Sequence, residues 1–295
     1  AELGFEFARR AGNGPKRSLN TTVLAGRSEQ RDPLSLIVFY RTHLGGLGNL
    51  LEVLLAQRSP AAREVIVQSD LATVNLVADP VLLERFAVRR VGCASHARRP
   101  FALYEHEDPD LCAHILHSFK GLAIHEYGLD VHGRNMENVT AIRGTDSRKI
   151  WEEMKWVCAM MTKRWSPETK LGQGARYILR HYEALTAYLD DPRLPPTNNF
   201  SERMLRMEKL IEGGSMFRAT LGGRFVLDIL RSVLQTAVAA QAPLQEYVMF
   251  VLRTPPEEIA AAPEQFTPAA WARMYIDEAE VEDEDEDELA ALAQP

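Results

Sequence analysis

The sequence lacks any apolar run of about 18 residues, which is close to the length that a helix needs to cross a membrane. Its beginning also lacks the pattern of a secretory signal, in which basic residues precede an apolar core. We therefore expect a cytoplasmic protein that has no membrane partner.

Cysteine is scarce, with Cys93, Cys112 and Cys158 as the whole set. Three cysteines leave one unpaired and cannot build a disulfide framework, which suits a reducing compartment. The stretches "CASH" at 93–96 and "CAH" at 112–114 contain four potential zinc ligands. Structural zinc sites, however, usually have two cysteines in the first pair and a wider spacing in the second. We therefore favour buried thiols and ordinary polar histidines over a zinc site.

The net charge of −7 is unevenly distributed along the chain. The run "DEAEVEDEDEDE" at 277–288 holds 10 of the 41 acidic residues. Without it, 34 basic residues face 31 acidic ones, a balance of about +3, so a nucleic-acid partner is not excluded. Such a run usually forms a solvated, disordered terminus. The alternative is a decoy that competes with DNA phosphates for a basic groove.

The first hundred residues favour an α/β layer. Apolar and β-branched runs bounded by turn or charged residues predict strands at 19–25, 34–40, 64–70 and 89–95. The apolar spacing of 48–58, between the second and third strands, is helical. This order, with a short connection before the last strand, predicts a mixed sheet.

After residue 100 the periodicity is almost entirely helical. Apolar residues at spacings of three and four predict helices at 147–165, 174–189, 223–241 and 244–253. The segment 125–146 is polar and lacks a period, which predicts a loop or an insertion between helices.

Two carboxylates stand at positions where they could bind a ligand or a metal ion. Asp70 closes a predicted strand, and ligands of α/β sheets gather at the carboxyl ends of strands. Glu202 lies in "LPPTNNFSER" at 194–203, where a proline-rich turn leads into a helix. Glu202 is then either a metal ligand or the partner of Asn199 as N-cap in a capping box.

The stretches "VQSD", "GCASHARRPF", "GARYILRHYEALTAYLDDPRLPPTNNFSERMLR" and "PLQEYVMFVL", in this order, resemble the catalytic region of insertion sequence 66 family transposases. These are bacterial enzymes of the DDE class. The resemblance covers roughly residues 17–275. It implies a ribonuclease H-like α/β fold: a mixed sheet with a large helical insertion at about 105–195 and a helical C-terminal part. We expect this domain at 18–275, after an extension at 1–17 and before an acidic tail at 276–295.

The resemblance also assigns site residues. Asp70 and Glu202 match the second and third acidic positions, which implies that they bind Mg²⁺ or Mn²⁺, and Asn20 stands at the position of the first aspartate. Other residues match the family's motifs around these acids: Cys93, His96, Arg98, Arg99, Asn198, Asn199 and Arg203. Four arginines near the site are expected to contact DNA phosphates. These are Arg98, Arg99, Arg203 and Arg206.

The expected chemistry depends on charge. Two metal ions about 4 Å apart can activate the attacking oxygen and stabilise the leaving one, so we expect Asp70 and Glu202 within about 8 Å of each other. Asn20 offers one oxygen but lacks the negative charge, and Asp32 is expected at the opposite end of the hairpin. The family is usually basic after the glutamate, whereas this chain reads "LIEGGSMFRAT" at 210–220.

These observations favour a transposase catalytic domain that cleaves and transfers strands of DNA. Its partners would be transposon ends, helper proteins of the same element and further copies of the chain on DNA, in a bacterial cytoplasm. One alternative is an inactive or domesticated relative that binds DNA or a protein. Another is an unrelated α/β scaffold in which "NNFSER" is only a capping box.

Overall fold

A computed structural model describes residues 19–26, 36–44, 47–59, 64–212 and 220–274. The chain divides into two compact units, Gly45–Phe200 and the remainder formed by Ala1–Leu44 with Ser201–Pro295. The described part is mostly helical with two small sheets, which confirms an α/β chain. The expected extension, the acidic tail and Asp32 lie outside the described residues. The ribonuclease H-like arrangement stays a prediction.

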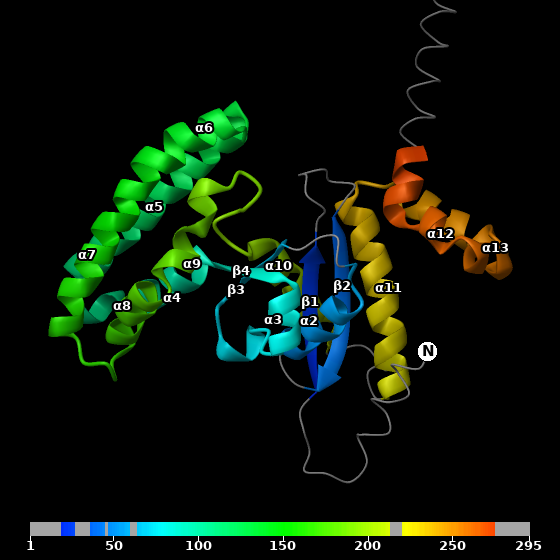
Figure 1. Ribbon diagram of the computed structural model, residues 1–295, viewed down its shortest axis with the longest axis horizontal. Helices are drawn as coiled ribbons and strands as arrows, with labels where there is room; N and C mark the ends of the chain where they lie inside the picture. The colour runs from blue at the N-terminus through cyan, green and yellow to red at the C-terminus, as the bar shows by residue number, and fades with distance from the viewer. Residues whose placement is uncertain (1–18, 27–35, 45–46, 60–63, 213–219, 275–295) are drawn as a thin grey trace, which may run out of the picture. The chain divides into compact units, whose positions relative to one another are not determined.

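In the unit formed by the two ends of the chain, β1 (Leu19–Gly26) and β2 (Ile37–Leu44) form an antiparallel pair in which Leu19 faces Leu44 (Figure 1). The second strand begins and ends later than the predicted 34–40. Its polar end belongs to the strand because cross-strand hydrogen bonds join Thr22 to His43, at 2.7 Å, and Thr21 to Thr42. The apolar run alone therefore misplaces this strand.

The outer edge of β2 is covered by α11 (Leu221–Ala239). Residues four apart on a helix are separated by about 6 Å, which nearly equals the advance of two residues along a strand. Polar side chains of α11 can therefore accept hydrogen bonds from every second backbone N–H of β2. The pairs are Thr42 with Asp228 at 2.6 Å, Tyr40 with Ser232 at 2.9 Å, and Val38 with Thr236 at 3.0 Å.

The remaining helices of this unit follow at the C-terminal side. They include α12 (Leu244–Arg253), α13 (Pro256–Ala261) and the 3-10 helix η7 (Pro263–Phe266). Their small core places the rings of Tyr247 and Trp271 5.7 Å apart. The helices predicted at 223–241 and 244–253 are confirmed as α11 and α12.

The other unit contains a parallel pair, β3 (Glu64–Ser69) and β4 (Ala87–Gly92), preceded by α2 (Leu47–Ala56). The crossover that a parallel pair requires is made by η2 (Thr73–Asn75) and α3 (Pro80–Arg85). The short α3 was not predicted, although Asp79 caps it and Pro80 opens it. The described strands form two two-stranded sheets, one in each unit, so the single mixed sheet is not confirmed.

Helices form the bulk of this unit. In chain order they are α4 (Ala94–Leu103), η3 (Glu105–Glu107), α5 (Pro109–His132), α6 (Met136–Ala141), the π-helix η4 (Ile142–Ser147), α7 (Arg148–Arg164), α8 (Lys170–Arg180), α9 (Tyr182–Thr186) and η5 (Ala187–Asp190). They share a core around Trp151 and Phe101. α8 packs so closely on α4 that a Cβ at Gly174 would lie 2.9 Å from Pro100. None of the described helices is both long and apolar enough to cross a membrane.

The loop predicted at 125–146 is wrong. Only residues 133–135 of this segment are not helical, and Gly133, with φ of +94°, follows the end of α5. The apolar period is missing because charged residues face the interior: Glu126 is 7% exposed and Arg143 is fully buried. A helical segment whose buried face carries charge looks, from sequence alone, like a polar loop.

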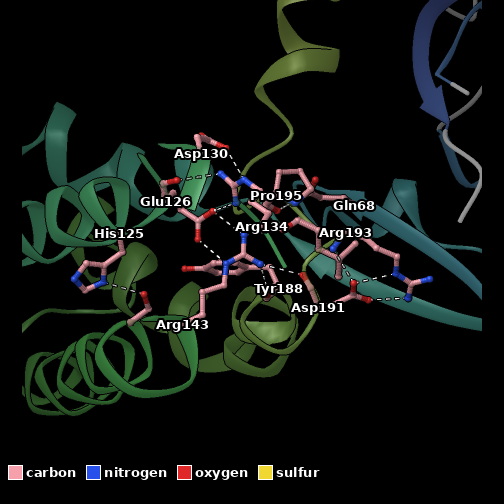
Figure 2. Close-up of polar contacts among 12 residues, drawn as sticks. Gln68, His125, Glu126, Asp130, Arg134, Arg143, Tyr188, Asp191, Arg193 and Pro195 are labelled. Carbon is pink, nitrogen blue, oxygen red and sulfur yellow. Dashed lines mark hydrogen bonds and ion pairs between the residues drawn. The ribbon is translucent and has the colours of Figure 1, made fainter. Parts of the chain in front are cut away.

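Arg143 is the centre of this buried polar network (Figure 2). Its Nε and Nη2 form a two-pronged pair with Glu126 at 2.7 and 2.6 Å. Its remaining N–H groups donate to backbone carbonyls of Tyr188 at 2.6 Å, Asp191 at 3.0 Å and Leu194 at 3.1 Å. All five donors of the guanidinium are thus used. Arg134 adds a third hydrogen bond to the Glu126 carboxylate.

Replacing Arg143 should therefore lower the stability of this unit strongly. Arg143→Met leaves the Glu126 carboxylate short of partners and three carbonyls without a donor, so we expect the free energy of unfolding to fall by about 3–5 kcal/mol. Arg148→Met is the matched control, because Arg148 pairs with Asp190 where the two side chains are 37% and 67% exposed. Its loss should cost less than about 1 kcal/mol. Urea unfolding measures both, and equal small losses would contradict the assigned role of Arg143.

Candidate functional site

Asp70 directly follows β3, at the carboxyl end of a parallel strand. Its Oδ1 accepts hydrogen bonds from the Ala72 amide at 3.0 Å and from Asn75 Nδ2 at 2.6 Å. In the part of the chain that the structure describes, Oδ2 makes no hydrogen bond. The half-buried carboxylate is therefore held in one orientation by one oxygen and offers the other to a ligand.

Tyr177 on α8 holds the backbone at the same place, because its hydroxyl donates to the carbonyl of Asp70 at 2.9 Å. Burial, and then the charges of Asp70 and Cys93, raise the pKa of Tyr177, so the phenol stays protonated and remains a donor. Sequence reasoning missed this contact. Tyr177 lies in the family-like block, but its helical spacing made it look like an ordinary core residue.

Cys93 is fully buried at the N-cap position of α4, directly after β4. Burial alone would raise its pKa, but hydrogen bonds from the His96 side chain and the Asn198 backbone outweigh burial and lower it. Burial raises the pKa of Cys112 to about 11 and that of Cys158 to about 12. All three thiols are free and buried, as predicted. No cluster of potential ligands among the described residues includes Cys112 or His114, so the four-ligand zinc set does not form.

The segment Asp191–Asn198, which we call the linking loop, leads into α10 (Asn199–Glu212). Its Pro196 carbonyl accepts from the Ala94 amide at 2.9 Å, and its Pro195 carbonyl accepts from Gln68 Nε2 at 2.7 Å. The Oδ1 of Asn199 accepts from the Ser95 hydroxyl at 3.1 Å. Asn199 is thus the first residue of the helix and bonds to α4, instead of acting as the expected N-cap. The linking loop is fixed to β3 and to the beginning of α4.

Asp191, at the beginning of the linking loop, is 6% exposed. Its carboxylate accepts from the backbone and side chain of Arg193 and from Arg89 at 3.3 Å. The hydrogen bonds from the Arg193 side chain are the main cause that lowers the pKa of Asp191. The negative charge of Asp191 therefore stabilises the loop.

Glu202 is half-buried in the first turn of α10. It is assigned to the other unit than Asp70, so the expected approach of the two carboxylates stays a prediction. Asn20 lies in β1 opposite His43, and its side chain is outside the description. The four arginines that are expected to contact phosphates are exposed and make no described ion pair. Two lie on α4, Arg98 and Arg99, and two on α10, Arg203 and Arg206.

Comparison with known proteins identifies the family of the chain. The family model described as Transposase IS66 family matches residues 64–224, which is more than half of the sequence. The chain belongs to the IS66 transposase family. The match begins with β3 and extends through Asp70, α4, the linking loop and Glu202.

A curated protein is also similar, over 153 residues. It is "Uncharacterized protein y4jD" of Sinorhizobium fredii (strain NBRC 101917 / NGR234), 24% identical over 153 residues. This stretch is 51% of the present chain and 29% of the relative, so the chain spans less than a third of that protein. No solved structure matches the chain.

The linking loop should show a specific pH dependence. Because the pKa of Asp191 is lowered from 3.8, its contribution to stability is present above pH 3.8 and lost as the pH falls through the lowered pKa. Asp191→Asn should therefore cost about 1–3 kcal/mol at about pH 6 and much less at about pH 2. The neighbouring exposed Asp190→Asn should change little at either pH. Urea unfolding at the two pH values measures the free energy of unfolding of each variant. An equal loss at both pH values in Asp191→Asn would contradict the predicted pH dependence.

Proposed function

We propose that the chain is the catalytic region of a DDE-class transposase that cleaves and transfers DNA strands, with Asp70 and Glu202 as metal-binding carboxylates. The observation that carries the proposal is the oriented carboxylate of Asp70 at the end of a parallel strand, inside the matched family region. Ligands of α/β sheets bind at this end of the strands. Glu202 follows in the same matched region, in the first turn of α10.

The donor set at Asp70 fits a hard divalent cation. Mg²⁺ prefers carboxylate oxygens, and the Oδ2 of Asp70 is left without a described hydrogen bond while Oδ1 fixes the orientation. When bound, such an ion supplies stabilisation of the charge that develops on the phosphate and lowers the pKa of an attacking oxygen. Asn75 acts as a positioning residue in this arrangement, because its amide bonds to the carboxylate.

The exposed arginines would hold the DNA. Arg98 and Arg99 follow the buried Cys93 by about one to two turns of α4, so their guanidinium groups extend from a fixed helix. Exposed arginines without an intramolecular acid can form two-pronged hydrogen bonds with phosphate oxygens. Such contacts position the backbone of the nucleic acid and do not read its sequence.

Asn20 favours a second candidate function, that of an inactive relative that binds DNA without cutting it. A carboxamide at the first acidic position leaves Asp70 and Glu202 with a charge of −2 against two ions of +4. One ion would then bind weakly. Helper proteins, self-association on DNA and a cytoplasmic location remain predictions under either function.

The two carboxylates can be tested through metal affinity. Asp70→Asn and Glu202→Gln should each weaken Mn²⁺ binding by at least about 100-fold, because even the loss of a hydrogen bond to a metal ligand costs about 10- to 100-fold. Asp79→Asn is the control, since Asp79 caps α3 and asparagine caps helices equally well. Mn²⁺ titration followed by electron paramagnetic resonance measures the affinity. Unchanged affinity in both site variants would remove these residues from the site.

Restoring the first acid should separate the two functions. Asn20→Asp adds the missing charge at nearly constant side-chain volume, so it should raise both Mg²⁺ affinity and DNA nicking by about tenfold or more. Asn20→Ala should leave a weak activity weak. Nicking of a supercoiled plasmid that carries the DNA flanking the chain's own gene compares the three proteins. If the aspartate variant is no more active than the parent, Asn20 does not occupy the first metal position or the chain only binds DNA.

A further inference from the structure

Gln68 lies on β3, two residues before Asp70. Its Nε2 donates to the Pro195 carbonyl at 2.7 Å and lies 3.4 Å from the Gly92 carbonyl at the end of β4 (Figure 2 draws the Pro195 contact). One side-chain amide therefore connects the strand that leads to Asp70, the neighbouring strand and the linking loop. The family comparison assigns no role to this residue.

The linking loop is held through three successive carbonyls. Arg143 donates to Leu194, Gln68 donates to Pro195, and the Ala94 amide donates to Pro196. Each donor comes from a different element, namely η4, β3 and α4. Consecutive prolines have no N–H and a fixed φ, so this part of the loop is stiff and depends on its carbonyls for hydrogen bonding. α10 begins three residues after Pro196.

We propose that Gln68 is a positioning residue that fixes the linking loop, and with it the beginning of α10 that leads to Glu202, to the strand that precedes Asp70. The path is short: Gln68 is two residues from Asp70 on one side, and Pro195 is four residues from Asn199 on the other. Glu202 then follows within one helical turn, an advance of about 4.5 Å. The effect on chemistry rests on the proposed function, whereas the mechanical link between β3 and α10 does not.

The residue type at position 68 is specific for this role. Glutamine supplies two N–H groups at the end of a side chain long enough to reach two carbonyls. Methionine has a similar length but no donor, and glutamate presents only acceptors to carbonyl oxygens. A hydrogen bond that served stability alone would, when removed, lower the melting temperature but would not selectively change metal affinity or turnover.

Gln68→Met and Gln68→Glu test the proposal in the full chain, with Gln173→Met as the matched control. Gln173 also donates from Nε2 to a backbone carbonyl, that of Glu168 at 3.1 Å, but on α8 and away from the linking loop. Hydrogen–deuterium exchange should become about 3- to 10-fold faster at the Ala94 amide and in residues 203–206 of the Gln68 variants only. Mn²⁺ affinity should fall as well.

Nicking of the same supercoiled plasmid, in the Asn20→Asp background, gives the second readout. The kcat of the Gln68 variants should fall about 10- to 100-fold with KM nearly unchanged, because misplacement by about 1 Å affects the chemical step more than DNA binding. Unchanged exchange at these amides, or an equal loss in Gln173→Met, would overturn the proposal. Faster exchange in the Gln68 variants, with no Mn²⁺ binding or nicking by the parent or by Asn20→Asp, would support the positioning role and reject the proposed function.

Discussion

The ion pair between Arg143 and Glu126 is the interaction on which the larger unit depends. Removing two charges from water is costly, and their attraction compensates for this only when the remaining donors and acceptors are satisfied. Here the three other N–H groups of the guanidinium bind carbonyls of η5 and the linking loop, and Arg134 adds a donor to the carboxylate. The pair thus orders a segment that has few backbone hydrogen bonds of its own.

The consequence for the site is that several chain reversals become rigid together. β3 leads into Asp70, β4 leads into Cys93, and the linking loop leads into Asn199. Contacts hold each of them: Tyr177 donates to the Asp70 carbonyl, Gln68 joins β3 to the linking loop, and the Asn198 backbone contacts the Cys93 thiol. A metal-dependent reaction needs ligands held before the metal arrives, and this arrangement supplies such preorganisation on the side of Asp70.

Much of the fold could be predicted from local pattern. The four strands, α2, α7, α11 and α12 were predicted because their apolar spacing is regular, whereas the longer α5 was not, and Asp70 and Glu202 were placed at a strand end and in a helix. The errors share a physical cause, which is that polar residues were assumed to be exposed. Glu126 and Arg143 are buried in helices that looked like a loop, and Thr42 and His43 extend a strand beyond its apolar run. Tyr177 and Gln68 act through contacts between residues far apart in sequence, which no local pattern records.

The cover that α11 gives to β2 also limits how this protein can associate with others. An unpaired strand edge is a template for a strand from another chain, and proteins usually protect such edges with charge, proline or a bulge. On β2 the protection is made by hydroxyl and carboxylate groups that already accept the N–H groups of Val38, Tyr40 and Thr42. An incoming strand would have to displace a whole helix there. Growth of this sheet by edge-to-edge pairing, whether in an assembly on DNA or in aggregation, is therefore restricted to β1, the strand that carries Asn20.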